Sequence, residues 1–479
     1  MSPAATTPGP PGPRERRHDH PSSDSARPPD GGGPTGPAPT GPARARGHDR
    51  EIIALAVPAF GALVAEPLFV MVDSAIVGHL GTPQLAGFGV AAALLTTAVG
   101  LFIFLAYATT AAVARRMGAG DLRSAIRQGI DGLWLAALLG ALVIAVTLPT
   151  APALVDAFGA SSTAAPHAVT YLRISSLGIP AMLLVLAATG VLRGLQDTRT
   201  PLYVAVGGFT ANAGLNAALV YGADLGIAGS AWGTVAAQWG MATAYVVVVV
   251  RGARRHGAPL RPELAGIRAS ATAGVPLLVR TLSLRAVLLI ATAVAAHLGD
   301  TEVAAHQIVL TLWSLLAFAL DAIAIAGQAI IGRHLGAGDA EGARAVCRRM
   351  VRWGIVSGVV LGGLLLAARP LLTPLYTSDA EVRAELMAAL LVVALAEPVC
   401  GIVFVLDGVL LGAGDGRYLA WASLGTLAVF LPAALAVPAV GGGLTALWWT
   451  MNLFMLARLA FLWTRARSGR WVVTGAVRA

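Results

Sequence analysis

The stretch PAFGALVAEPLFVMVDSAIVGHLGTPQLAG, residues 58–87, is the starting point for reading the whole chain. It is apolar enough to cross a bilayer, yet it contains two carboxylates, Glu66 and Asp73. Seven residues at about 100° each place both acids near one helical face, about 10 Å apart along the axis. A carboxylate at the centre of a membrane helix costs about 3 kcal/mol, so such acids usually face a cavity, a partner or a pathway. The stretch therefore predicts a membrane helix with a functional acidic face.

The whole chain has the composition of a polytopic membrane protein. Of its 479 residues, 56% are hydrophobic and only 12% are charged, which is far from the balance of a soluble domain. The net charge of +9 comes from arginines in short loops between apolar runs. In such loops arginine sets the topology, so the charge does not indicate nucleic-acid binding. The two cysteines, Cys347 and Cys400, imply no disulfide framework.

Twelve apolar segments are near or above the length of about 20 residues that a membrane helix needs. They span 51–78, 85–114, 125–149, 165–192, 201–222, 226–250, 268–298, 303–333, 349–368, 384–411, 418–438 and 442–466. Arginines gather in the loops after the even-numbered segments, so both termini are expected in the cytoplasm. Residues 1–49 are rich in Pro, Gly and Ser, which predicts a disordered cytoplasmic tail. The predicted fold class is an all-α polytopic membrane protein with twelve transmembrane helices.

The chain also contains an internal repeat. The shift that carries Pro58 onto Pro276 also aligns, without a gap, the GAGD turns at 118–121 and 336–339 and Asp197 with Asp415. Two six-helix lobes follow, related by a pseudo-twofold axis along the membrane normal, with a site between them. We expect an N-lobe at 50–250, a cytoplasmic inter-lobe loop at 251–267, a C-lobe at 268–466 and a cytoplasmic tail at 467–479.

Acidic residues break this repeat. Asp73 and Glu66 align with Ala291 and Leu284, so the two acids belong to the N-lobe alone. The C-lobe has its own set, Asp321, Glu397 and Asp407. A polar residue that only supported the repeated scaffold would tend to appear in both halves. The asymmetry therefore marks these acids as candidate site residues.

The motifs assembled here resemble the multidrug and toxic compound extrusion (MATE) family and, within it, the DinF-like branch. They are MVDSAIVGHLG at 71–81, VLRGLQDTRTPL at 191–202, the two GAGD turns, LDAIAIAGQAIIGRHLGAGD at 320–339 and VFVLDGVLLGAGDGRYLA at 403–420. The resemblance covers about residues 51–465. It implies a secondary active exporter in a bacterial plasma membrane that exchanges H⁺ or Na⁺ for amphipathic, often cationic, compounds by alternating access.

The resemblance also implies a coupling site. The first-helix aspartate of the family corresponds to Asp73, and a polar N-lobe cluster known in some members corresponds to Asn212 and Thr234. The aspartate expected in the N-x-x-x-D pattern is Asn216 in this chain, which removes one titratable group. Asp73 is left as the principal coupling carboxylate, with Glu66 as a second acid. If the coupling ion is Na⁺, we expect it near Asp73, and we expect no other metal.

Several of these residues have a structural alternative. Asn212 and Asn216 lie one helical turn apart, and they either serve the site or hold helices together. Asp321 either has a functional role or bonds to Arg280 or Arg285. Arg280 is a candidate for a C-lobe cavity together with the acids, or neutralises those acids in the protein interior.

A second function also stays open. A transporter of lipid-linked precursors or anionic metabolites would need Arg173, Arg280 and Arg285 to line the cavity. The sequence has no Walker pattern, no G-x-S-x-G motif and no metal-spaced histidine cluster, so we expect no enzyme and no cofactor. The expected partners are the bilayer and small amphipathic molecules, without nucleic acid, and the expected state is a monomer.

Overall fold

Helices make up nearly all of residues 42–477, which are the residues that the computed structural model describes. The first half contains α1 (Pro42–Gly78), α2 (Thr82–Leu101), α3 (Phe104–Gly118), α4 (Leu122–Ala157), α5 (Ala165–Ser176), α6 (Ile179–Gly194), α7 (Arg199–Ala217), a π-helical turn (Ala218–Gly222) and α8 (Gly226–Arg255). The second half contains α9 (Leu264–Leu298), α10 (Asp300–Gly336), α11 (Ala340–Tyr376), α12 (Ala380–Gly412), α13 (Gly416–Ala439) and α14 (Leu444–Ser468). Within the described residues there is no strand.

The predicted all-α fold class is confirmed. Eleven helical segments are long and apolar enough to cross a membrane, and the bent pair α5–α6 makes up a twelfth span. The observed helix boundaries differ from the predicted ones in two places. α1 begins at Pro42, inside the segment expected to be a disordered tail, while residues 1–41 lie outside the described part of the chain. The connection between α8 and α9 is only residues 256–263, shorter than the predicted loop at 251–267.

The internal repeat recurs in the packing of the helices. Gly140 of α4 lies so close to Pro180 of α6 that a Cβ would overlap the proline backbone. At the same shift along the chain, Gly358 of α11 lies equally close to Pro398 of α12. Because only glycine permits these approaches, the two halves use the same device to bring equivalent helices together.

One span is sharply bent in the first half, and its counterpart in the second half is a continuous helix. α5 and α6 meet at an angle of 49°, across Leu177 and Gly178. Pro180, in the first turn of α6, lacks the amide that would continue the helix. The equivalent Pro398 is accommodated inside α12. The repeat partner of Gly178 is Ala396, and glycine is a much weaker helix former than alanine.

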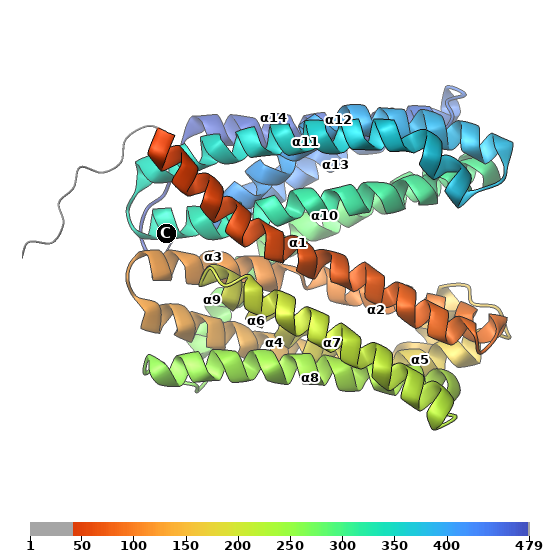
Figure 1. Ribbon diagram of the computed structural model, residues 1–479, viewed down its shortest axis with the longest axis horizontal. Helices are drawn as coiled ribbons and strands as arrows, with labels where there is room; N and C mark the ends of the chain where they lie inside the picture. The colour runs from red at the N-terminus through yellow and green to blue at the C-terminus, as the bar shows by residue number, and fades with distance from the viewer. Residues whose placement is uncertain (1–41, 478–479) are drawn as a thin grey trace, which may run out of the picture. The chain divides into compact units, whose positions relative to one another are not determined.

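Helix α1 contacts elements of both halves (Figure 1). Near its beginning, Asp49 accepts a hydrogen bond of 2.6 Å from Arg349 Nε of α11, and Glu51 lies 2.5 Å from Arg333 of α10. In its middle, Ala59 packs against α10. Near its end, Asp73 contacts α7. This path places the acidic helix along the boundary between the two halves.

Candidate functional site

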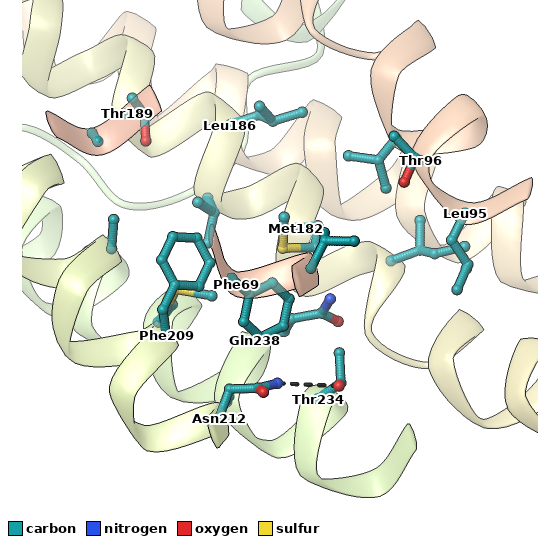
Figure 2. A pocket seen from close by; sticks show the side chains of 18 of the residues that line it. Phe69, Leu95, Thr96, Met182, Leu186, Thr189, Phe209, Asn212, Thr234 and Gln238 are labelled. Carbon is teal, nitrogen blue, oxygen red and sulfur yellow. Dashed lines mark hydrogen bonds between the residues drawn. The ribbon is translucent and has the colours of Figure 1, made fainter. Parts of the chain in front are cut away.

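A network of buried polar side chains joins α1, α7 and α8. Asn216 Nδ2 donates to the carboxylate of Asp73 and, at 2.9 Å, to Asn212 Oδ1. Asn212 Nδ2 donates to Thr234 Oγ1 at 3.1 Å, as Figure 2 shows. All four side chains are buried, Asp73 to 2% exposure. The structure thus brings together the four described N-lobe residues that the resemblance indicated.

Glu66 occupies the same helix as Asp73, two turns earlier. Its side chain lies outside the described part of the structure. Its proposed role as a second acid therefore stays a prediction.

The hydrogen bonds of this network do not use all of the buried side-chain oxygens in and around it. Asn216 Oδ1 is buried without a hydrogen-bond partner in the described chain, and the buried hydroxyls of Ser175 and Ser230 lie around the hydroxyl of Tyr171, which also contacts Thr234. Buried polar atoms of this kind are normally satisfied by a ligand, an ion or ordered water. Carboxylate, amide and hydroxyl oxygens are the donors that hard cations such as Na⁺ prefer. The network can therefore accept either a proton at Asp73 or a small cation among these oxygens.

The network forms one end of a cavity of about 260 Å³. The lining comes from α1, α2, α3 and α5–α8, and Asp321 on α10 adds one residue from the second half. The middle is apolar, with the rings of Phe69 and Phe209 stacked at 4.9 Å between their centroids. Such a cavity suits a molecule with an apolar body and a polar end.

The other end of the cavity is polar as well. Tyr107, Thr189, Arg193, Tyr245 and Asp321 all contribute to its lining. Arg193 directly follows the apolar segment 165–192, a position where arginine is expected to set the topology, and no sequence pattern distinguishes the two tyrosines. One signal could have revealed Arg193, because its repeat partner is Leu411 and it therefore breaks the repeat just as Asp73 does.

The remaining C-lobe candidates lie outside this lining. Arg280 and Asp407 form a buried ion pair, and Arg458 lies 3.5 Å from the same carboxylate. Glu397 is buried, and its Oε2 has no hydrogen-bond partner among the described residues. Asp321 therefore stands apart from the other three candidates as the one that reaches the cavity.

The C-lobe counterpart of the cavity is nearly closed by aromatic rings. Trp313 and Trp448 line a pocket of about 10 Å³. They stand at the repeat positions of Leu95 and Ser230, so the second half has large rings where the first has smaller side chains. Phe430, which is fully buried, likewise occupies the position of Asn212. The hollow is thus a property of the first half.

A transporter of lipid-linked precursors or anionic metabolites would need Arg173, Arg280 and Arg285 to line the cavity, and none of the three belongs to its lining. Arg280 is paired with Asp407, and Arg173 and Arg285 are exposed. Among the described residues, Arg193 is the one arginine in the cavity lining.

Comparison with known proteins identifies the family. The MatE family model matches residues 58–218 and again 276–435, one match in each half. The chain belongs to the MatE family. This family comprises the multidrug and toxic compound extrusion transporters, so the chain is a multi-pass membrane protein whose relatives are transporters and not enzymes. The repeated match agrees with the constant shift of the internal repeat and with the glycine contacts of the two halves.

Relatives occur in plants and bacteria. "Protein DETOXIFICATION 44, chloroplastic" of Arabidopsis thaliana is 31% identical, with 88% of this chain and 83% of that protein covered. "DNA damage-inducible protein F" of Escherichia coli K12 is 28% identical, with 88% and 94% covered. These two proteins bear out the predicted MATE and DinF resemblance.

A solved structure shares the fold of this MatE protein. It is described as the outward-facing conformation of a multidrug resistance MATE family transporter of the MOP superfamily, and it matches with a TM-score of 0.80 at 20% identity. The match covers 88% of this chain and 97% of that one. The two-lobe architecture is thereby confirmed.

Proposed function

We propose that this MatE protein is a secondary active exporter that exchanges H⁺ or Na⁺ for amphipathic compounds, with Asp73 as the principal coupling carboxylate. The observation that carries the proposal is the position of Asp73. Its buried carboxylate belongs to the lining of an otherwise mainly apolar cavity and accepts a hydrogen bond from Asn216. A compound in this cavity and an ion at Asp73 compete for the same carboxylate.

Competition at one carboxylate is sufficient for coupling. When Asp73 is charged, it attracts the cationic end of a substrate, and the apolar walls bind the substrate body. When a proton or Na⁺ neutralises Asp73, that attraction is lost and the substrate is released. Because each ligand lowers the affinity for the other, a gradient of the ion drives net export of the compound.

The proposed membrane is a bacterial plasma membrane, with both termini in the cytoplasm. Arginines at the helix ends that flank the α3–α4, α6–α7 and α8–α9 connections, and in the last of these connections itself, support this orientation under the positive-inside rule. Labelling of single introduced cysteines tests it. A membrane-impermeant reagent added outside should label Ala160→Cys between α4 and α5 and leave Glu341→Cys in α11 unlabelled. The reverse pattern would mean that the orientation is inverted.

Replacement of Asp73 by asparagine tests the coupling role. Asp73→Asn keeps the side-chain size and imitates the neutral carboxyl, so the chain should fold and insert. Efflux driven by an imposed gradient should fall to background in liposomes, measured separately with H⁺ and with Na⁺ gradients, and the gradient that drives efflux by the wild type identifies the ion.

The matched control is Asp156→Asn, which alters an exposed aspartate at the end of α4. It should transport at the wild-type rate. Wild-type efflux by Asp73→Asn at equal protein density would falsify the assignment.

A further inference from the structure

The end of the cavity opposite Asp73 carries two charged groups. Arg193 of α6 and Asp321 of α10 both line it. Both side chains are half-buried, and the structure gives neither of them a hydrogen bond or an ion pair within residues 42–477. A guanidinium that lines a cavity with its donors unused can accept an anionic group of a ligand.

The two polar ends are separated by a defined length. On α7 the lining runs from Asn212 to Pro201, and on α8 it runs from Thr234 to Tyr245. Each interval is eleven residues, or about 16 Å along a helix axis. In Figure 2, Phe209 lies between the Asn212–Thr234 pair and the labelled Thr189. The cavity therefore has an apolar middle section between its two polar ends.

The charges near the second end do not cancel. Arg193 and Arg280 both interact electrostatically with Asp321, and Asp407 belongs to the same group. Arg458 interacts with Asp407 and Arg280. Three guanidiniums against two carboxylates leave one positive charge in excess. Within this group Arg193 is the guanidinium that lines the cavity, and the opposite end of the cavity holds the carboxylate of Asp73.

We propose that Arg193 makes the second end an anion subsite, which selects zwitterionic amphiphiles whose cationic and anionic groups are separated by an apolar chain. This inference rests on the proposed export of amphipathic compounds and specifies their class. The cationic group lies at Asp73, the chain passes the stacked phenylalanine rings, and a carboxylate, sulfonate or phosphate receives the paired donors of Arg193. Asp321 restrains the subsite, because its negative charge opposes an incoming anion.

The experiment compares two ligands of equal chain length. Purified protein in phosphatidylcholine nanodiscs is titrated with ω-aminododecanoic acid, a zwitterion, and with dodecylamine, which lacks the carboxylate. The zwitterion should bind the wild type about tenfold more tightly, the factor that corresponds to about 1.4 kcal/mol. The short ω-aminohexanoic acid should gain no such advantage over hexylamine, because it cannot reach both ends.

Three variants change the preference for the zwitterion in predictable directions, downward at Arg193 and upward at Asp321. Arg193→Gln should remove the preference for the zwitterion, Arg193→Lys should retain part of it, and Asp321→Asn should increase it. The matched control, Arg173→Gln, alters an exposed arginine of the same half and should leave the preference unchanged. A loss of folding would not produce opposite signs in the Arg193 and Asp321 variants.

Equal affinity of the two long ligands for the wild type, or an unchanged preference in Arg193→Gln, overturns the anion subsite. If dodecylamine is still exported against a gradient in that case, the proposed export function stands and only the subsite is lost. If neither ligand binds and neither is exported, the proposed function fails with it.

Discussion

At the scale of single residues, the repeat shows which side chains were added to a symmetric scaffold. Asp73 stands where the second half has Ala291, and Asn216 stands where it has Ala434. Both residues meet in one buried network, although 143 positions separate them in the chain. Asp73 and Asn216 are thus polar where the second half has alanine, and they contact each other. The proposed coupling role explains why polar side chains are needed at both positions.

Asn216→Asp tests how this network handles a proton. The change places a second carboxylate against Asp73, and two adjacent carboxylates in a poorly solvated site cannot both be ionised at low cost. The pair should keep a shared proton at a pH at which Asp73 alone has released it. We expect the pH profile of gradient-driven efflux to move upward by about one unit or more, measured in liposomes with the same ion gradient imposed at each pH.

The control for this variant is Asn452→Asp, because Asn452 is the repeat partner of Thr234 and lies outside the cavity lining. Its efflux profile should coincide with that of the wild type. An Asn216→Asp profile that also coincides with the wild type would show that the network does not couple ion to substrate.

The residues of the site were predictable from sequence to different degrees. Asp73 could be found because an acid in an apolar helix is costly, and Asn212 and Thr234 because the motif resemblance pointed to them. Arg193 could not be separated from the topological arginines by composition, since it lies at the end of a span, where such arginines are common. Its place in the cavity depends on how α6 packs against α3 and α8, which no local pattern specifies.

At the scale of helices, hydropathy predicts that a span exists but not whether it is straight. The hydropathy of segment 165–192 predicts one helix, and the structure divides it into α5 and α6. After the break, α5 contributes Tyr171 to the cavity lining and α6 contributes Arg193. Gly178 followed by Pro180 was the available signal, but the continuous α12 shows that proline alone does not decide the outcome.

The cavity of the first half is also explained at the scale of helices and of the side chains that they carry. Helices at equivalent positions leave a cavity of about 260 Å³ in one half and a pocket of about 10 Å³ in the other. The difference follows from side-chain size at repeat positions, for example Ser230 against Trp448. The repeat therefore predicts the frame of both lobes, while the volume within each depends on individual substitutions.

At the scale of the whole protein, the two halves meet through contacts that obey the repeat. Gly118 of α3 lies against the backbone of Arg333 on α10, and Gly336 of α10 lies against the backbone of Arg115 on α3. Each contact becomes the other under the shift that relates the two halves. Ala114 and Gly332 are partners under the same shift, and they face each other, so this pair marks the pseudo-twofold axis.

Arg115 adds further bonds across this contact. Its guanidinium donates to the carbonyl of Ala413 at 3.2 Å and to that of Val473, beyond α14, at 2.6 Å. Gly475 in turn donates to the carbonyl of Leu335 at 2.9 Å. Under the proposed orientation, these contacts close the cavity on its cytoplasmic side, and alternating access requires them to separate in every cycle.

A disulfide across the pseudo-twofold axis tests that requirement. A Cβ on Gly332 would lie 2.7 Å from that of Ala114, so a small separation of α3 and α10 gives the spacing of about 3.8 Å that a disulfide needs. We expect Ala114→Cys with Gly332→Cys, in a background lacking Cys347 and Cys400, to lose efflux on oxidation and to regain it on reduction. The control is Val113→Cys with Gly194→Cys, where the same Cβ distance of 2.7 Å joins α3 to α6 within one lobe. That bond should leave efflux intact, because the proposed cycle moves the lobes as units. Full efflux with the inter-lobe disulfide formed, verified by a mobility shift on non-reducing gels, would show that α3 and α10 need not separate during transport.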